Sequence, residues 1–437
     1  MDATTAPPSR RDFLSSSAGV AAGAGLASGG LLSGCASPRE ADEVAAIDEA
    51  LAHLTDARDQ LEPISGAERA ARRQRLAGLL ADADLDALLV EPGATMTYLS
   101  GIGWGRSERL FGLVVLADGS HFWLTPGFEE DRTRLLVDAE DGPGGEVVTW
   151  QEHEYAYAPL AAELRRRRAT RIAVDPSIRF FHASRLGAEM GGALPSSGHA
   201  LVVELRGRKD EHELALLRRA NELTQLAILE SSHLFRPGMT GRDLSRIVRR
   251  AHERLGLTGH WDLSLIGPSA AYPHGEDTPR PLERGQVILI DTGGSYHGYQ
   301  SDNTRSWVFD APPNERQATV WSAVRDAQRA AFEALAPGRR AGDVDAAARG
   351  VLEAAGLTTG YSHFTHRLGH GIGLEGHEDP YLDAGSDTIL APGMTFSDEP
   401  GIYIQGEFGI RCEDIVVVTE TGADHLGEWQ QGPESPA

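Results

Sequence analysis

Two segments near the C-terminus each hold a pair of acidic residues at equal distances from a candidate turn. The first runs from Asp291 to Asp302, and the ten residues between these acids are TGGSYHGYQS. An apolar run at 287–290 precedes it, and a second strand-like run begins at Asp302. If the chain turns between Tyr296 and His297, the two acids oppose each other on antiparallel strands, with Cβ atoms about 5 Å apart. This segment is therefore predicted to form a hairpin with both acids on one face.

A second acidic hairpin is predicted between Glu399 and Glu413. These glutamates are symmetrical about Gly406, so a turn at Gly406 brings them face to face. Asp398 and Asp414 adjoin the two glutamates, and alternation along a strand points them to the opposite face. We therefore expect Asp398 and Asp414 to lie outside the site that the glutamates form.

Five residues in the last third of the chain are candidate metal ligands. They are Asp291, Asp302, His370, Glu399 and Glu413, each in a glycine-rich, strand-like segment. Four carboxylates and one imidazole carry four negative charges, which two divalent cations would balance while activating one water. A single acid near a turn is more often a solvated surface group. Here, however, apolar runs at 287–290 and 415–418 adjoin two of the acids, and a buried unpaired carboxylate is costly. The set predicts a two-metal hydrolase.

The histidine of that set lies in a segment rich in histidine and glycine. The spacing of His366 and His370 would suit a helix, as in the zinc proteases. Three glycines within residues 369–373 argue against a helix, and in an extended segment the two histidines share one face. The same glycines do not indicate a nucleotide-binding loop, because the strand before, the helix after and the downstream acid are missing.

Three stretches of the chain resemble the aminopeptidase P, prolidase and creatinase family of pita-bread hydrolases. They are PHGEDTPRPLERGQVILIDTGGSYHGYQSDNTRSW (273–307), HRLGHGIGLEGHEDPYL (366–382) and MTFSDEPGIYIQGEFGIRCEDIVVVT (394–419). Together they hold all five metal-ligand positions of the family in order. The resemblance runs from about residue 67 to 425 and is weaker in its N-terminal half. It implies an α/β N-terminal domain followed by an α+β pita-bread catalytic domain.

The resemblance also implies roles for the matching positions. Two metal ions, commonly manganese or cobalt and alternatively zinc, would be bound by Asp291, Asp302, His370, Glu399 and Glu413. Oxygen-rich ligation independently suits manganese. In such enzymes a hydroxide bridging the metals attacks the scissile carbonyl, and the position of Glu399 takes the proton of the water as general base.

Four further positions match family residues that handle substrate. His274, His366 and His377 match histidines that bind substrate, stabilise the tetrahedral intermediate or shuttle a proton. A side chain that titrates near neutral pH suits that work. Arg411 matches an arginine near the metals that organises or binds substrate. From the residues alone, Arg411 also suits the solvent face of a strand.

The implied substrates are peptides that contain proline. An Xaa-Pro bond lacks the N–H that an ordinary strand-binding protease cleft requires. Prolidases cleave free dipeptides, whereas aminopeptidases P remove the first residue from longer peptides whose second residue is proline. Several prolidases place an arginine just after the motif at 377–380 to hold the carboxylate of a dipeptide. Here Tyr381 and Leu382 follow that motif, and no arginine occurs before Glu399. This departure argues against strict dipeptidase action, although another arginine could substitute.

The same residues bear on the other activities that this fold supports. Creatinases work without metal and have lost most of the ligand set, which this chain retains. Methionine aminopeptidases lack the preceding α/β domain for which this chain has room. A metal-dependent lyase or hydrolase of a small metabolite, and a catalytically silent peptide-binding lipoprotein, stay open as alternatives.

The N-terminus has the features of a twin-arginine export signal. The sequence SRRDFL at 9–14 is followed by a weakly apolar stretch at 18–32, which is too short and too rich in glycine for a transmembrane helix. The stretch ends in Leu32-Ser33-Gly34-Cys35, which looks like a bacterial lipobox with lipidation at Cys35. We therefore expect export by the twin-arginine route to the periplasm or cell surface, with a lipid anchor in the membrane.

The remaining chain divides into three parts in this interpretation. After the signal at 1–34, residues 35–66 form a helix or tether that spaces the enzyme from the membrane. Residues 67–207 form the N-terminal α/β domain, with strands near 85–90, 113–116 and 171–174 and a helix at 160–168. Residues 208–437 form the catalytic domain, opened by an amphipathic helix from Lys209 to Leu234. Two domains also suit the length, since one core seldom exceeds about 250–300 residues.

Cysteine content and net charge narrow the interpretation further. Only Cys35 and Cys412 occur, so no disulfide framework is expected within the mature chain, and alternation turns Cys412 away from Glu413 into a buried position. The net charge of −23 argues against nucleic-acid binding. The resemblance implies a homodimer.

Overall fold

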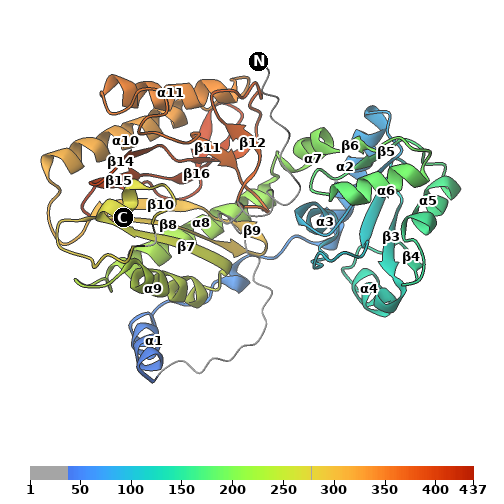
Figure 1. Ribbon diagram of the computed structural model, residues 1–437, viewed down its shortest axis with the longest axis horizontal. Coiled ribbons are helices and arrows are strands. Elements are labelled where there is room, and N and C mark those ends of the chain that lie inside the picture. The colour runs from blue at the N-terminus through green and yellow to red at the C-terminus, as the bar shows by residue number, and fades with distance from the viewer. Residues whose placement is uncertain (1–37, 277) are drawn as a thin grey trace, which may run out of the picture. The chain divides into compact units, whose positions relative to one another are not determined.

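Figure 1 presents the computed structural model of the chain, in which residues 38–276 and 278–437 are described. The chain divides into two units, Met1–Ala45 and Ala46–Ala437. Of the first unit, only the start of helix α1 (Pro38–Ala50) falls within the described residues. The predicted twin-arginine segment and Cys35 lie outside them. Among the described helices, none combines the length and apolar character that crossing a bilayer requires.

The first domain of the second unit is built on a six-stranded mixed sheet with the order β4-β3-β2-β1-β5-β6. Its strands are β1 (Ala87–Val90), β2 (Gly112–Leu116), β3 (His121–Pro126), β4 (Glu146–Trp150), β5 (Ile172–Val174) and β6 (Ser196–Ser197). Its helices are α2 (Gly66–Asp82), α3 (Ala94–Ser100), α4 (Glu130–Val137), α5 (Tyr157–Arg166), α6 (Phe180–Glu189) and α7 (His199–Arg206). The predicted strands and the predicted helix at 160–168 are confirmed.

Helices cover both faces of this sheet because apolar residues occupy every position of its central strands. Leu88 and Val90 of β1 pack toward α2 and α7, whereas Leu89 packs toward α5 and α6. Alternation along β1 therefore supplies two hydrophobic cores, one on each side. The result is a three-layer α/β domain.

The catalytic domain begins at α8 (Glu211–Ser232), which confirms the helix expected from Lys209 to Leu234. The Asp210 side chain caps its N-terminus by accepting from the Glu213 backbone N–H, and the Glu213 side chain accepts from the Asp210 backbone N–H. The other helices are α9 (Gly241–Arg254), α10 (Glu315–Ala334) and α11 (Ala341–Ala354). The strands are β7 (Thr258–Ile266), β8 (Val287–Tyr296), β9 (Tyr299–Gln300), β10 (Asn303–Val308), β11 (Gly369–Gly371), β12 (Glu378–Leu382), β13 (Thr395–Asp398), β14 (Gly401–Ile404), β15 (Phe408–Arg411), β16 (Asp414–Val418) and β17 (Ala423–His425).

These strands form two main sheets between two helix pairs (Figure 1). Helices α8 and α9 pack on the sheet β10-β8-β7, where Ile288 and Ile290 enter their core. Helices α10 and α11 pack on the sheet β12-β11-β13-β16-β17, where Phe396 and Val416 enter theirs. An isolated bridge between Thr304 and Glu413 joins the two sheets, with N···O distances of 3.3 and 3.2 Å. The strands that carry the acidic residues therefore meet at the middle of the domain.

The first acidic hairpin forms, but its turn lies one residue later than predicted. His297 and Gly298 occupy the two central turn positions with φ of 49° and 93°. A two-residue turn with both φ positive matches the twist of the flanking strands. Asp291 therefore pairs with Thr304, and Asp302 becomes its diagonal neighbour on the same face instead of its direct partner.

The second acidic hairpin turns at Gly406, as predicted. Gly406 has a φ of 81°, and β14 pairs with β15 symmetrically about it. The same register continues beyond this hairpin, where Asp398 of β13 pairs with Asp414 of β16. Glu399 and Glu413 are therefore opposite each other across the hairpin.

The segment at 51–64 differs from the expected tether because it packs on the catalytic domain. Its buried residues are Leu51, Leu54, Ala57 and Ile64, which join a core with helix α8. The Tyr296 hydroxyl donates to the Ala57 carbonyl at 2.8 Å, and the His297 ring contacts the Leu61 carbonyl at 3.0 Å. This segment therefore fastens the tip of the first acidic hairpin and does not serve as a spacer.

Candidate metal centre

The structure brings all five predicted metal ligands together. Potential ligand atoms of His370, Glu399 and Glu413 lie within 4.8 Å of one another, and so do those of Asp291, Asp302 and Glu413. The two groups share Glu413. Two neighbouring groups of potential ligands that share one carboxylate could hold a pair of divalent cations.

His370 presents an unprotonated nitrogen to this cluster. Its Nδ1 lies 3.1 Å from the Gly371 carbonyl, so Nδ1–H is the donor and Nε2 keeps its lone pair. Nε2 lies 3.4 Å from Glu399 Oε1 and 3.6 Å from Asp302 Oδ2. Burial lowers the pKa of His370 to about 3, so the imidazole is neutral at pH 7 and available to a metal ion.

The acid cluster is short of positive charge. Among the described residues, Arg411 is the one arginine or lysine whose side chain pairs with these carboxylates. Its guanidinium lies 2.5 Å from Asp291 and 3.9 Å from Glu413. Asp291 Oδ1 and Asp302 Oδ1 are buried without a hydrogen-bond partner. Buried oxygens of this kind are stable when they coordinate metal. The donor set therefore fits two hard or borderline divalent cations.

The pKa values of the carboxyls reflect the same crowding. Burial raises the pKa of Asp302 well above its usual range, and the neighbouring charges of Glu413 and Asp291 raise it further. Burial also raises the pKa of Glu413 well above its usual range, and the charge of Glu399 raises it further. The pKa of Glu399 is raised to about 7, again mainly by burial. Without cations these groups retain protons that metal binding would displace.

Arg411 lies inside the site and not on a strand surface. Its side chain is buried, and its Nε donates to Thr304 Oγ1 at 2.9 Å. Thr304 in turn donates to Glu413 Oε2 at 2.6 Å. The sequence reasoning missed Thr304, although its position two residues after Asp302 places it on the same strand face. Thr304 and Arg411 together fix the orientation of the shared glutamate.

Tyr403 is a second residue that the sequence reasoning missed. Arg411 Nη1 donates to its hydroxyl at 2.8 Å, and that hydroxyl lies 2.8 Å from His366 Nε2. His366 Nδ1 lies 2.7 Å from the Arg367 carbonyl and must donate to it. Nε2 of His366 is therefore the acceptor for the tyrosine proton. Burial lowers the pKa of His366 to about 3, so this chain of donors contains a neutral imidazole at pH 7.

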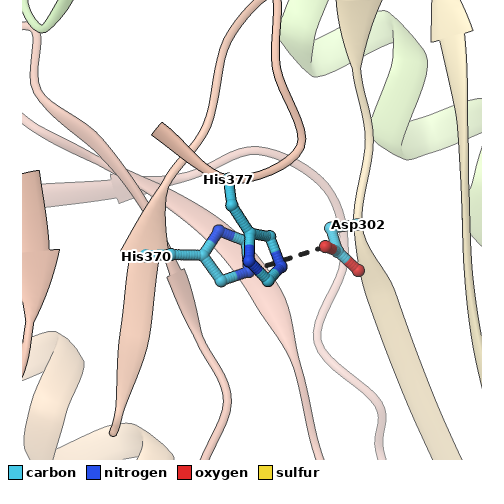
Figure 2. Close-up of side chains that lie close together, drawn as sticks. All are labelled: Asp302, His370 and His377. Carbon is cyan, nitrogen blue, oxygen red and sulfur yellow. Dashed lines mark ion pairs between the residues drawn. The ribbon is translucent and has the colours of Figure 1, made fainter. Parts of the chain in front are cut away.

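His377 reaches Asp302 and His370 from a loop. Figure 2 shows its ring lying against that of His370, with ring centroids 3.7 Å apart, beside Asp302. Atoms of these three residues form a third group within 4.8 Å. His274 is exposed and borders a cavity of about 350 Å³ beside β7, which is also lined by Leu263 and Arg280. His377 is also exposed and borders a different pocket, which is lined by Arg206 and Tyr381 as well.

The acids next to the two glutamates have a separate environment. Asp414 is buried and pairs with Arg305 at 2.7 Å, and it also accepts from Gln328 at 3.0 Å. Asp398 is fully buried, and both of its carboxyl oxygens are without a hydrogen-bond partner. Cys412 is buried in the adjoining hydrophobic core. None of the three belongs to a group of potential metal ligands among the described residues.

Comparison with known families matches three segments of the chain. Residues 215–420 match the metallopeptidase family M24, and residues 72–207 match the creatinase/prolidase N-terminal domain. Residues 7–27 match the twin-arginine translocation pathway signal sequence.

Individual relatives align over most of the chain. The probable dipeptidase PepE of Mycobacterium tuberculosis is 39% identical over 363 residues, which cover 82% of this chain and 94% of the relative. The Xaa-Pro dipeptidase of Lactobacillus delbrueckii subsp. lactis is 31% identical, covering 80% of this chain and 94% of the relative. The crystal structure of dipeptidase PepE from Mycobacterium ulcerans superposes with a TM-score of 0.78 at 33% identity, covering 85% of this chain and 99% of that chain.

Proposed function

The chain belongs to metallopeptidase family M24, and from this premise we propose that it is a two-metal peptidase that cleaves the bond before proline in short peptides. A relative supports this specificity, since the Xaa-Pro dipeptidase of Lactobacillus delbrueckii subsp. lactis is 31% identical over 80% of the chain. The α/β domain before the catalytic domain, with a boundary near residue 207, is part of the same proposal.

The observation that carries the proposal is the pair of ligand groups that share Glu413. We assign Asp291, Asp302, His370, Glu399 and Glu413 as the residues that hold two divalent cations, manganese being the first candidate because oxygen donors predominate. Bound there, the cations would polarise a carbonyl oxygen and acidify a water molecule.

The protein groups around the ligands supply proton transfer and charge stabilisation in this proposal. Glu399 is the general base in this proposal, because its carboxyl lies among the ligand atoms, where it can accept a proton from the activated water. Arg411 and Tyr403 hold His366 in one tautomer at the site. His274 and His377 are both exposed and border pockets, and in this proposal they bind the substrate and donate to the oxygen that becomes negative.

The experiment that tests this function is hydrolysis of Ala-Pro, Ala-Pro-Ala and Ala-Ala-Ala by the purified protein, with and without Mn²⁺. We expect manganese-dependent cleavage before proline and no cleavage of Ala-Ala-Ala. A protein that binds Mn²⁺ and cleaves none of the three would contradict a peptidase function and favour the lyase or the silent binder.

Export and anchoring are proposed from the N-terminal sequence. The match to a twin-arginine signal supports export, and we propose that Cys35 carries a lipid anchor after removal of residues 1–34. A Cys35→Ala variant should leave the membrane fraction and appear in the soluble fraction. Unchanged membrane association of this variant would exclude the anchor at Cys35.

A further inference from the structure

The side chain of His377 has no hydrogen bond or ion pair to hold it at the metal centre, within the part of the chain that the structure describes. Its ring only lies against that of His370, with ring centroids 3.7 Å apart (Figure 2). His377 is the last residue of the loop at 372–377, and Glu378 begins strand β12 directly after it. The proposed peptidase function, on which this step rests, assigns His377 to the substrate. Whatever fixes this loop therefore fixes a residue of the reaction.

Glu378 fastens the end of this loop through a buried ion cluster. Its Oε1 accepts from Lys209 Nζ at 2.7 Å, and its Oε2 accepts from Arg206 Nη2 at 2.5 Å. The side chains of Lys209, Arg206 and Glu378 are 2%, 8% and 7% exposed, so water screens these contacts little. Burial alone would raise the pKa of Glu378, but the charges of Lys209 and Arg206 lower it, and the carboxylate is ionised. Hydrogen bonds between ionised groups are roughly twice as strong as neutral ones.

Both cations of the cluster are fixed by further contacts. Arg206 is the last residue of α7, and its Nη1 donates to Thr95 Oγ1 at 3.2 Å. Its Nη2 also donates to Glu375 Oε2 at 2.7 Å, so a second residue of the loop is held. The backbone N–H of Lys209 donates to the Gly393 carbonyl at 2.8 Å. The cluster therefore joins the loop to segments that are distant in sequence.

Lys209 is the only lysine in the chain, although the sequence holds 41 lysine and arginine residues in all. An ammonium is a compact point charge, whereas a guanidinium is a wide planar fork. A Cβ at Gly373 would lie 2.5 Å from Glu378 Oε1 and 3.0 Å from Lys209 Cε, so the loop backbone packs directly on the ion pair. This packing limits the room for a larger cation. The single lysine stands where the fold needs a small buried cation beneath the loop.

We propose that Lys209 and Arg206 are positioning residues for the reaction: by binding Glu378 they hold the loop at 372–377 and set the place of the His377 ring beside the metal centre. Their acidic partners in the cluster are Glu375 and Glu378, which are not among the proposed metal ligands. They act on the reaction only through the loop. Because Arg206 ends α7, the N-terminal α/β domain takes part in holding the site.

The test measures kcat and KM on Ala-Pro and Ala-Pro-Ala for the manganese-loaded full chain, Lys209→Met and Arg206→Met. A misplacement of about 1 Å at a reacting group can cost about 10²-fold in rate. We expect Lys209→Met to lower kcat and kcat/KM by the same factor, roughly 10- to 100-fold, while the number of bound manganese ions stays the same. Arg206→Met should show a smaller loss, because Lys209 still binds Glu378, and it serves as the test if Lys209→Met does not fold. Unchanged kcat in the folded variants would overturn the proposal.

A double-mutant cycle shows whether Lys209 acts through His377. If it does, Lys209→Met should cause little further loss of kcat in a chain that already carries His377→Ala, because the two changes affect one interaction. Independent residues would give losses that multiply. Multiplying losses would overturn the proposal.

The control is Arg72→Met, which breaks another buried ion pair. Arg72 lies 3.4 Å from Glu213 of α8, and both side chains are buried. Removal of one partner of such a pair is destabilising wherever it lies. Arg72→Met should therefore lower stability as Lys209→Met does, but leave kcat unchanged. An equal fall of kcat in both variants would overturn the proposal, since lost stability alone would then explain it.

Amide hydrogen exchange separates this inference from the proposed activity, because it needs no turnover. In the manganese-loaded full chain, Lys209→Met should speed exchange at 372–378 and leave exchange in β16, at 414–418, unchanged. Unchanged exchange at 372–378 would refute the role of the cluster, whatever the activity. Faster exchange there, in a protein whose unmodified form cleaves none of the peptides, would refute the peptidase function and retain the cluster as the fastening of the loop.

Discussion

The two faces of the β13–β16 pair carry the same kinds of residue in different surroundings. On one face, Glu399 and Glu413 meet Asp291 and Asp302 with a single arginine nearby. On the other face, Asp414 is neutralised by Arg305 and hydrogen-bonded by Gln328. We name these the ligand face and the structural face. The ligand face holds four carboxylates against one guanidinium, whereas the charge of Asp414 is balanced by the protein itself.

This difference teaches that local charge balance, and not residue type, separates a metal ligand from a structural acid. Asp398 adjoins Glu399 in sequence and is also fully buried, yet it lies on the structural face and joins no ligand group. A buried carboxylate can be stabilised by a metal ion, by an arginine or by retaining its proton. In the proposed function, the ligand face, Asp414 and Asp398 would correspond to these three cases in turn.

The largest expected effect is on the ligand face. Glu399→Gln keeps the size of the side chain but removes the proton acceptor and a metal-binding oxygen. Because general acid–base catalysis alone contributes about 10²- to 10⁴-fold, we expect kcat on Ala-Pro to fall by at least that factor at saturating Mn²⁺. Glu407→Gln is the matched control, since Glu407 is an exposed acid in the turn of the same hairpin. Near-normal activity of Glu399→Gln would place the base elsewhere.

On the structural face, the expected effect is on stability. Asp414→Asn leaves Arg305 buried without its charged partner. Breaking a buried ion pair in this way costs about 3–5 kcal/mol, so the urea midpoint should fall substantially while the number of bound metal ions stays the same. A variant with normal stability and reduced metal binding would show that Asp414 belongs to the ligand face instead.

The two faces should also respond to pH in opposite directions. In the metal-free protein, the pKa of Glu399 is about 7, above its usual value of 4.5. Between these values the folded chain binds more protons than the unfolded chain, so stability falls as pH rises, by up to about 1.4 kcal/mol per pH unit for each such group. The pKa of Asp414 is lowered, with burial opposing and Arg305 producing the decrease. Its contribution is present above pH 3.8 and is lost on acidification.

Urea unfolding of the metal-free protein between pH 5 and 7.5 measures this contrast. The buried neutral imidazoles of His366 and His370 add the opposite slope below about pH 6.5, so the carboxyl contribution is measured as a difference between variants. The pH slope of stability should be more negative in the unmodified chain than in Glu399→Gln, and it should become more positive once Mn²⁺ is present, since ions displace the retained protons. Identical slopes in the two metal-free proteins would mean that Glu399 retains no proton there.

The smallest effect is expected at Asp398. Burial raises its pKa well above the usual range, which favours the protonated, neutral carboxyl. Asp398→Asn replaces one neutral group by another of similar shape, and we expect a change in unfolding free energy of less than about 1 kcal/mol. A large loss of stability would reveal an ionised Asp398 that Arg325 or another cation stabilises.

The sequence predicted the ligand face well because its evidence is local. Symmetry about Gly406 gave the correct register of the second hairpin, and alternation separated Glu399 from Asp398. The glycines of the histidine segment correctly argued against a helix. The structure shows a further need for glycine there, because a Cβ at Gly369 would collide with the Ser397 carbonyl. Patterns of period two and single turn residues are readable without tertiary structure.

Other features depend on contacts between distant segments and could not be predicted in the same way. The turn at His297 shifted the first hairpin by one residue. This could not be predicted, because a histidine with positive φ is uncommon. Tyr403 joins the site through Arg411 and His366, a contact that only the folded sheet creates. The segment at 51–64 has the composition of a solvated helix, yet its few apolar residues are enough to dock it.

The most direct test of the account is a titration of Mn²⁺ into the chelator-treated protein, followed by calorimetry and by hydrolysis of Ala-Pro. We expect two ions per chain, with activity returning as they bind, and weaker binding of both ions in Glu413→Gln because both ligand groups share this residue. Full activity in the chelator-treated protein, or no manganese bound at neutral pH, would contradict the assignment of the ligand face as a two-metal centre.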